Sequence, residues 1–139
     1  MMINHLNYDS DYGEIILDSA EPFAKKILEH FTSKATLEIL ELTQNPRTIC
    51  EICARSSYSK ATLYRRISNL LDCCLLFAVK KENNNCQKYG SWMYAKSFYA
   101  ISVRSGQTSV DSDCQDTIIE ILSKRKFYGQ ILKTIRNCR

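Results

Sequence analysis

The stretch from residue 47 to residue 76 constrains the fold more than any other part of the chain. Its sequence is RTICEICARSSYSKATLYRRISNLLDCCLL. Thr48 and Glu51 have the spacing of a capping box, in which two side chains satisfy free backbone N–H groups where a helix starts. Ser59 is a favourable N-cap for a second helix. The apolar residues of that helix fall on one stripe, formed by Leu63, Ile67, Leu70 and Leu71. The pattern predicts two helices joined by a short turn, a helix-turn-helix.

The opposite face of the second predicted helix is polar and basic. Ala61 and Ser68 are small, and Arg65 lies between them. A cationic face backed by an apolar stripe is typical of a helix that lies in the major groove of DNA. We therefore expect DNA contacts from the helix residues Ser59, Lys60, Thr62, Tyr64, Arg65, Arg66 and Asn69.

The distribution of charge points to the same segment. Residues 1–46 contain three Lys or Arg and eight Asp or Glu, residues 47–104 contain ten and three, and residues 105–139 contain six and four. A basic excess on one segment is the electrostatic pattern of a surface that binds phosphate groups. The alternative is a solvated face with a chance surplus of lysine.

The remaining elements predict a mainly α chain with one small β-hairpin. We expect a flexible segment over residues 1–17, a helix after Ser19, and a second helix from about Ser33 to Thr43. Residues 76–82 alternate as a strand, and Ser97–Val103 is rich in β-branched and aromatic residues, as a returning strand would be. A last helix is expected from residues 111–116 to about residue 137.

The predicted order is α-α-α-α-β-β-α, a winged helix-turn-helix with flanking dimerisation helices. The domains would be a flexible segment (1–17), a winged helix-turn-helix domain with its N-terminal helix (18–104) and a C-terminal dimerisation helix (110–139). The hairpin, or wing, would contact the DNA backbone or minor groove through Lys80, Lys81 and Lys88.

The first and last predicted helices carry apolar stripes that the minimal winged helix does not cover. Such an exposed stripe usually finds a partner, so we expect a homodimer. Its interface would comprise Phe23, Ile27, Phe31, Ile118, Ile121, Leu122, Tyr128, Leu132 and Ile135. In the alternative, both helices fold back onto their own subunit.

Residues 20–104 resemble the ArsR/SmtB-like winged-helix transcriptional regulators of archaea and bacteria. FTSKATLEILEL is similar to the second-helix entry of that family, ICEICARSSYSKATLYRRISNLL to its helix pair, and FYAISV to the strand that closes its wing. The chain departs from the family in having Thr36 in place of Arg, and Ser57 and Cys74 in place of Gly in two turns. Cys50 matches one cysteine of the family's metal-sensing Cys-x-Cys, and Thr48 stands at the other. The resemblance implies a dimeric DNA-binding regulator.

Cysteines and aromatic residues leave alternatives open. Seven cysteines cannot all pair within one chain, and the polar, acidic N-terminus is unlike a secretory signal, so reduced thiols in a cytoplasmic protein are expected. Cys50 and Cys53 are consistent with core packing, redox sensing or metal binding; we predict no metal and no cofactor. Tyr89, Trp92, Tyr94, Phe98 and Tyr99 either form the core of the wing or stack on bases.

The sequence contains no Gly-rich phosphate loop, no nucleophile elbow, no HExxH motif and no apolar run of membrane-spanning length. We therefore expect a non-enzymatic protein without a membrane partner. The leading hypothesis is a homodimeric transcriptional regulator that binds double-stranded DNA sequence-specifically. The alternatives are a winged-helix adaptor that binds only proteins, a thiol- or metal-responsive sensor of the same fold, and a single-strand binder.

Overall fold

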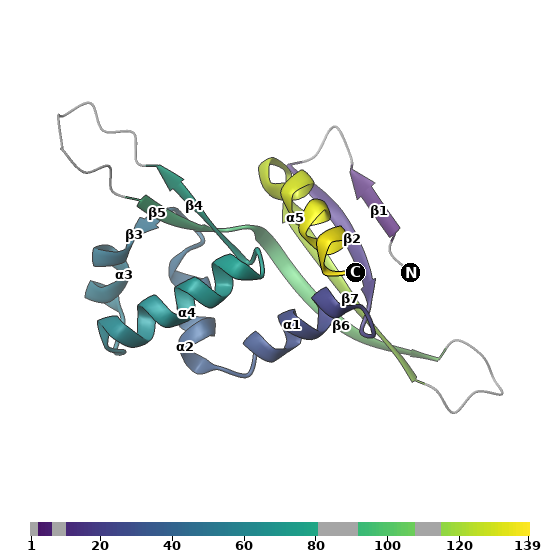
Figure 1. Cartoon of the computed structure of the whole chain (residues 1–139), viewed down its shortest axis with the longest axis horizontal. Coiled ribbons are helices and arrows are strands. Elements are labelled where there is room, and N and C mark those ends of the chain that lie inside the picture. Colours follow the sequence, from purple (N-terminus) through teal and green to yellow (C-terminus); the bar gives the residue numbers. More distant parts are fainter. Residues whose placement is uncertain (1–2, 7–10, 81–91, 108–114) are drawn as a thin grey trace. The chain divides into compact units, whose positions relative to one another are not determined.

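The computed structural model of the chain describes residues 3–6, 11–80, 92–107 and 115–139. It contains two compact units (Figure 1). Unit 1 comprises Met1–Glu29 and Phe98–Arg139, and unit 2 comprises His30–Ser97. Unit 2 is thus inserted into the sequence of unit 1.

Unit 1 is built around a four-stranded antiparallel sheet of order β1-β2-β7-β6. Its strands are β1 (Ile3–Leu6), β2 (Tyr12–Asp18), β6 (Phe98–Gln107) and β7 (Gln115–Lys124). Two helices accompany the sheet, α1 (Pro22–His30) after β2 and α5 (Arg125–Cys138) after β7. Strands from opposite ends of the chain therefore lie side by side in one sheet.

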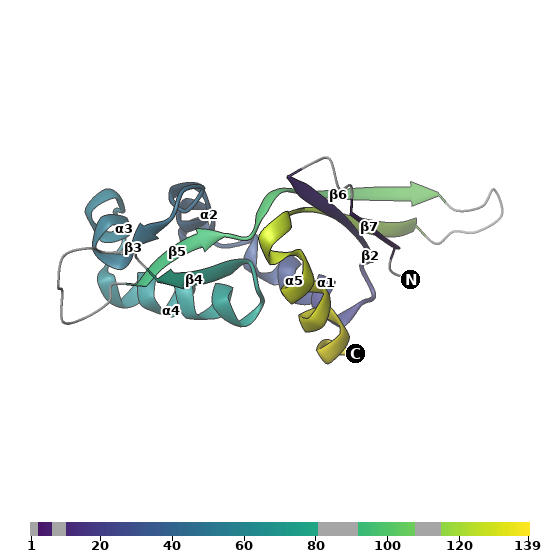
Figure 2. The same cartoon turned by 90° about the horizontal axis from the view of Figure 1, so that it is seen from above.

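One face of this sheet is buried under the two helices, which lie on the same side of it (Figure 2). Along β2, burial alternates with a period of two, and Ile15 and Leu17 are fully buried. They pair across the ladder with Ile121 and Ile119, which are also buried. The helices contribute the rest of the core through Phe23, Ala24, Ile27, Phe127, Tyr128, Ile131 and Ile135.

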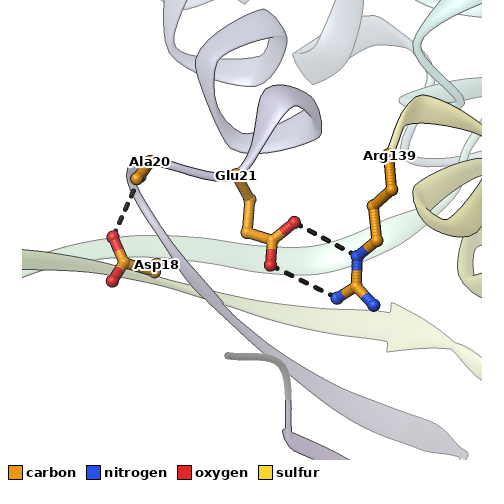
Figure 3. A network of polar contacts seen from close by, with 4 residues as sticks. All are labelled: Asp18, Ala20, Glu21 and Arg139. Carbon is orange, nitrogen blue, oxygen red and sulfur yellow. Dashed lines mark hydrogen bonds and ion pairs between the residues drawn. The ribbon is translucent and has the colours of Figure 1, made fainter.

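Polar contacts join α5 to the segment that leads into α1. The Arg139 guanidinium donates from Nε and Nη2 to the two carboxylate oxygens of Glu21, each at 3.3 Å (Figure 3). The backbone N–H of Ala20 donates to Asp18 Oδ1 at 2.9 Å in the turn after β2. The ion pair stabilises the end of α5 only modestly, since Arg139 is exposed to solvent.

Unit 2 contains three helices and a three-stranded antiparallel sheet. Its elements are α2 (Lys34–Leu42), β3 (Arg47–Thr48), α3 (Ile49–Arg55), α4 (Lys60–Asp72), β4 (Leu76–Lys80) and β5 (Trp92–Lys96). The strand order is β3-β5-β4. Its core is formed by Ile39, Leu40, Ile52, Leu63, Ile67, Leu70, Leu75, Leu76 and Ala95.

The fold-class prediction is wrong: the chain is an α+β protein, not a mainly α protein with one small hairpin. The four-stranded sheet of unit 1 overturns it. The predicted returning strand was also wrong, because β4 pairs with Trp92–Lys96, whereas Phe98–Gln107 pairs with β7. The β-propensity of FYAISV was read correctly, but this strand and its partner β7 both belong to unit 1, whereas the hairpin belongs to unit 2.

The predicted ends of the chain need the same correction. Residues 115–124, expected as the start of a long helix, form β7, and α5 begins only at Arg125. The segment TIIEIL has apolar residues that fit both helical spacing and a strand. Residues 12–17, expected to be flexible, belong to β2, where the small Gly13 and two acidic residues obscure the alternation.

The residues assigned to a dimer interface are largely covered by their own chain. Phe23, Ile27, Ile121, Tyr128 and Ile135 are buried. The remaining four, Phe31, Ile118, Leu122 and Leu132, are half-buried. The exposed stripe that placed an interface on these helices is thus absent from the described residues, and the helices fold back onto their own subunit. The dimer itself stays a prediction without this surface.

Candidate nucleic-acid interface

The first helix of the pair starts where the capping box was predicted. Thr48 Oγ1 accepts a hydrogen bond from the backbone N–H of Glu51 at 3.2 Å. Glu51 Oε1 in turn accepts from the Thr48 N–H at 3.5 Å and from the Thr48 hydroxyl at 3.1 Å. The reciprocal bonds define the start of α3.

The second helix starts at its predicted N-cap. Ser59 Oγ accepts from the backbone N–H of Thr62 at 3.3 Å, and the two hydroxyl oxygens lie 2.9 Å apart. In the preceding turn, Ser56 Oγ accepts from the Tyr58 N–H at 3.1 Å. The Ser59 hydroxyl, predicted to contact DNA, is therefore already used in capping α4.

The apolar stripe of α4 is buried as predicted at Leu63, Ile67 and Leu70, while Leu71 is half-buried. At 100° per residue, Arg65 points away from this stripe, with Ala61 and Ser68 beside it. All three are exposed. The outermost surface of α4 therefore consists of two small residues flanking one arginine.

The two edges of this face differ in character. On one edge lie the exposed Lys60 and Tyr64, with the ammonium group 5.8 Å from the ring centroid. This is a cation–π distance. The other edge carries the half-buried Thr62, Arg66 and Asn69. We use the name α4 face for the surface formed by Ser59, Lys60, Ala61, Thr62, Tyr64, Arg65, Arg66, Ser68 and Asn69.

Arg66 sits deeper than a freely solvated arginine. Its Nε is buried and has no hydrogen-bond partner among the described residues. A buried donor without a partner costs roughly 1–3 kcal/mol. Arg66 therefore contributes a positive charge to the edge of the α4 face rather than to its centre.

The charged residues of α4 are placed unfavourably for the stability of the helix. Its first turn contains Lys60 and no acidic residue, and Asp72 at the last position is its one carboxylate. A cation near a helix N-terminus opposes the macrodipole, by about 0.3–1 kcal/mol when exposed. Glu51, the acidic residue of the neighbouring helix α3, is engaged in the capping box. The N-terminal half of α4 is therefore positively charged and has no carboxylate of its own helix beside it.

The hairpin adds an aromatic residue that the predicted set did not include. Lys80, at the end of β4, is exposed and stands opposite Trp92 in the register of β4 and β5. The Trp92 side chain is 55% exposed. The signal for it was an aromatic residue in the basic hairpin, which was interpreted mainly as core. Lys81 and Lys88, the other predicted hairpin contacts, lie outside the described residues, as does Tyr89.

The other aromatic residues of the predicted group separate between the units. Tyr94 is half-buried on β5 of unit 2. Phe98 and Tyr99 lie on β6 of unit 1, so they belong to a different sheet from the hairpin.

The cysteines near the helix pair lie in different environments. Cys50 is exposed and Cys53 half-buried, both as free thiols. Cys73, at the end of α4, is buried, and the loss of solvent raises the pKa of its thiol to about 11. Across the described ranges, no three His, Cys, Asp or Glu side chains gather where they could hold a metal ion.

Comparison with known proteins identifies no relative: the sequence matches no protein-family model, no curated protein and no solved structure. The resemblance to ArsR/SmtB-like regulators therefore stays a prediction. None of the helices in the described part of the chain has the length and apolar character needed to cross a membrane.

Proposed function

We propose that the chain is a regulator of transcription that binds double-stranded DNA sequence-specifically through the α4 face. The observation that carries the proposal is the positive charge of the N-terminal half of α4, which has no carboxylate of its own helix beside it. Lys60 and Arg65 are exposed there, and the turn that presents the helix is built by two capped helix starts. Local rules are broken here without a benefit to folding, which is typical of a functional surface.

The physical fit to a duplex is specific in shape as well as charge. The major groove of B-DNA admits one α-helix, and its floor is reached by side chains from the outermost helical positions. At those positions α4 has Ala61, Arg65 and Ser68. Small residues beside one arginine let the backbone approach the bases, and Arg pairs bidentately with guanine O6 and N7. Lys60 and Lys80 would bind phosphate groups, which position the helix.

The proposal includes a homodimer, because two copies would double the contacts and read a palindromic site. The alternative function, a protein-binding adaptor, differs from it in one measurable property. An adaptor would tolerate loss of positive charge on α4.

The test is a fluorescence-anisotropy titration of the full chain against a mixed-sequence duplex across a series of salt concentrations. Affinity should fall steeply with salt because bound Lys and Arg release counterions from the duplex. Lys60→Ala should reduce the slope of log K against log salt by about 1. Arg65→Ala should weaken binding to a selected sequence by about 1–3 kcal/mol.

Lys34→Ala is the matched control, because Lys34 is exposed in the same unit but lies on α2. It should leave both quantities close to wild type. Absence of duplex binding at low salt, or equal effects of all three substitutions, would refute the proposal in favour of the adaptor.

A further inference from the structure

Strand β6 forms one end of the four-stranded sheet of unit 1. It pairs with β7 along one edge, and its other edge has no strand partner within the described ranges. The regular part of the ladder starts at Ala100, after a register shift between Phe98 and Ala100. An open strand edge presents a row of backbone N–H and C=O groups that can pair with another chain.

Residues 98–103 of β6 lack the features that usually prevent such pairing. Proteins usually protect an exposed edge with lysine, proline or an inward-pointing charge. Residues 98–103 of β6 are FYAISV, without charge or proline, and Arg104 is the single charged residue of the strand. Arg104 is itself paired with Glu120 of β7 on the same sheet. An open edge along residues 98–103, which are uncharged and of high β-propensity, is suited to pairing with a partner strand.

The apolar character of this strand reaches solvent at two large residues, Tyr99 and Val103. Ile101 and Val103 stand opposite Ile121 and Ile119 of β7, the buried residues of the helix-covered face. Ile101 is half-buried, but Val103 is 51% exposed. The apolar layer of unit 1 is therefore continuous from β7 to β6 and ends unfinished at the edge.

We propose that β6 pairs antiparallel with β6 of a second copy of this chain, about a two-fold axis at Ser102. In this register Ile101 of each copy stands opposite Val103 of the other. The four β-branched side chains then continue the apolar layer across the junction. Arg104 stands opposite Ala100, so no like charges face each other. A second copy fits because this self-complementary alignment lies wholly in the regular part of the strand.

The β6 pairing would supply the two-fold symmetry that the proposed DNA-binding function uses, and in that respect this inference rests on the proposed function. The dimer is measured without DNA, so a failure of the β6 pairing and a failure of DNA binding can be told apart. In sedimentation velocity of the reduced full chain, wild type should be dimeric at tens of micromolar and dissociate on dilution. Val103→Lys should shift the dissociation constant upward by about tenfold or more, because it places a charge in the apolar junction.

Leu37→Lys is the matched control, since Leu37 is another exposed large apolar residue, 46% exposed, on α2 of unit 2. It should leave the dimer intact. A monomeric wild type, a dimer that survives Val103→Lys, or equal loss in both variants would overturn the proposal. Hydrogen exchange on the wild type gives a second readout that needs no variant. Among residues 100–104, the amides that point away from β7 should lose protection on dilution, whereas those that point toward β7 should keep it. Protection of the outward-pointing amides that is independent of concentration would also overturn the proposal.

Discussion

Replacing Cys74 with glycine should stabilise unit 2. Cys74 follows the end of α4 and has φ of 60°, the only positive φ at a non-glycine residue in the described chain. Its N–H donates to the Leu71 carbonyl at 3.2 Å, and the N–H of Leu75 donates to the Leu70 carbonyl at 3.0 Å. These two bonds define a Schellman motif, whose left-handed residue is usually glycine. Leu70 and Leu75, the two positions whose side chains usually pack together in this motif, are both buried.

The size of the gain follows from two opposing terms. A side chain in the left-handed region costs roughly 1–2 kcal/mol, whereas glycine loses about 0.5–1 kcal/mol more conformational entropy on folding. The net expectation for Cys74→Gly is an increase of about 1 kcal/mol in the free energy of unfolding. For a unit of this size that corresponds to a rise in Tm of about 4–8 °C.

The assay is thermal and urea unfolding followed by tryptophan fluorescence. Trp92 is the single tryptophan of the chain and lies in the same unit as Cys74, so its emission reports on that unit. Cys74→Ala separates the backbone effect from loss of the thiol, because alanine keeps the strained Cβ; it should give no gain.

Ser57→Gly is the second control. Ser57 occupies the other turn in which the resembled family has glycine, but its backbone does not have positive φ. Glycine there should lower the free energy of unfolding by about 0.4–1 kcal/mol through chain entropy. The reasoning is refuted if Cys74→Gly gains no stability, or if alanine at 74 or glycine at 57 gains as much.

Three further predictions concern packing, thiol reactivity and capping. Gly13→Ala should destabilise the chain by about 1–3 kcal/mol in urea unfolding followed by circular dichroism, because the new Cβ would clash with the ring of Tyr128. In the double variant Gly13→Ala plus Tyr128→Ala the clash is absent, so its loss of stability should be smaller than the sum of the losses in the two single variants. In alkylation followed by mass spectrometry at pH 8, Cys50 should react rapidly and Cys73 only after unfolding, and equal labelling of both thiols would contradict this. Burial raises the pKa of Cys73 from 9.0 to about 11, so the stability contributed by its protonated thiol is complete below pH 9 and is lost as pH rises through about 11. Thr48→Ala should cost about 1 kcal/mol by removing the cap of α3, and an unchanged midpoint of unfolding would argue against the capping box.

The sequence predicted those features of unit 2 that depend on near neighbours. The helix starts at Thr48 and Ser59 were found because a cap and its partner lie three residues apart. The stripe of Leu63, Ile67 and Leu70 was found for the same reason, since helical spacing is local. The exposed positions of Lys60 and Arg65 followed from that stripe.

The parts that could not be predicted depend on partners far apart in the chain. β2 pairs with β7, which follows it by about a hundred residues, and the sequence of neither strand indicates which strand it pairs with. The TIIEIL segment of β7 satisfies helical and strand spacing alike, so only its neighbours in the sheet decide the outcome. For Trp92 a place in the core of the hairpin was favoured over stacking on bases, because an aromatic residue in a hairpin is usually buried. Trp92 is exposed because of its position as the first residue of β5, which residue type does not indicate.

The central claim is that the α4 face binds duplex DNA, and the most direct measurement maps the bound surface on the protein. An NMR titration of the ¹⁵N-labelled full chain with a short mixed-sequence duplex gives that map. We predict that the amides with the largest shift changes lie between Ser56 and Asn69 and around Lys80 and Trp92, and that they return on addition of salt. Shift changes confined to unit 1, or none at low salt, would contradict the account.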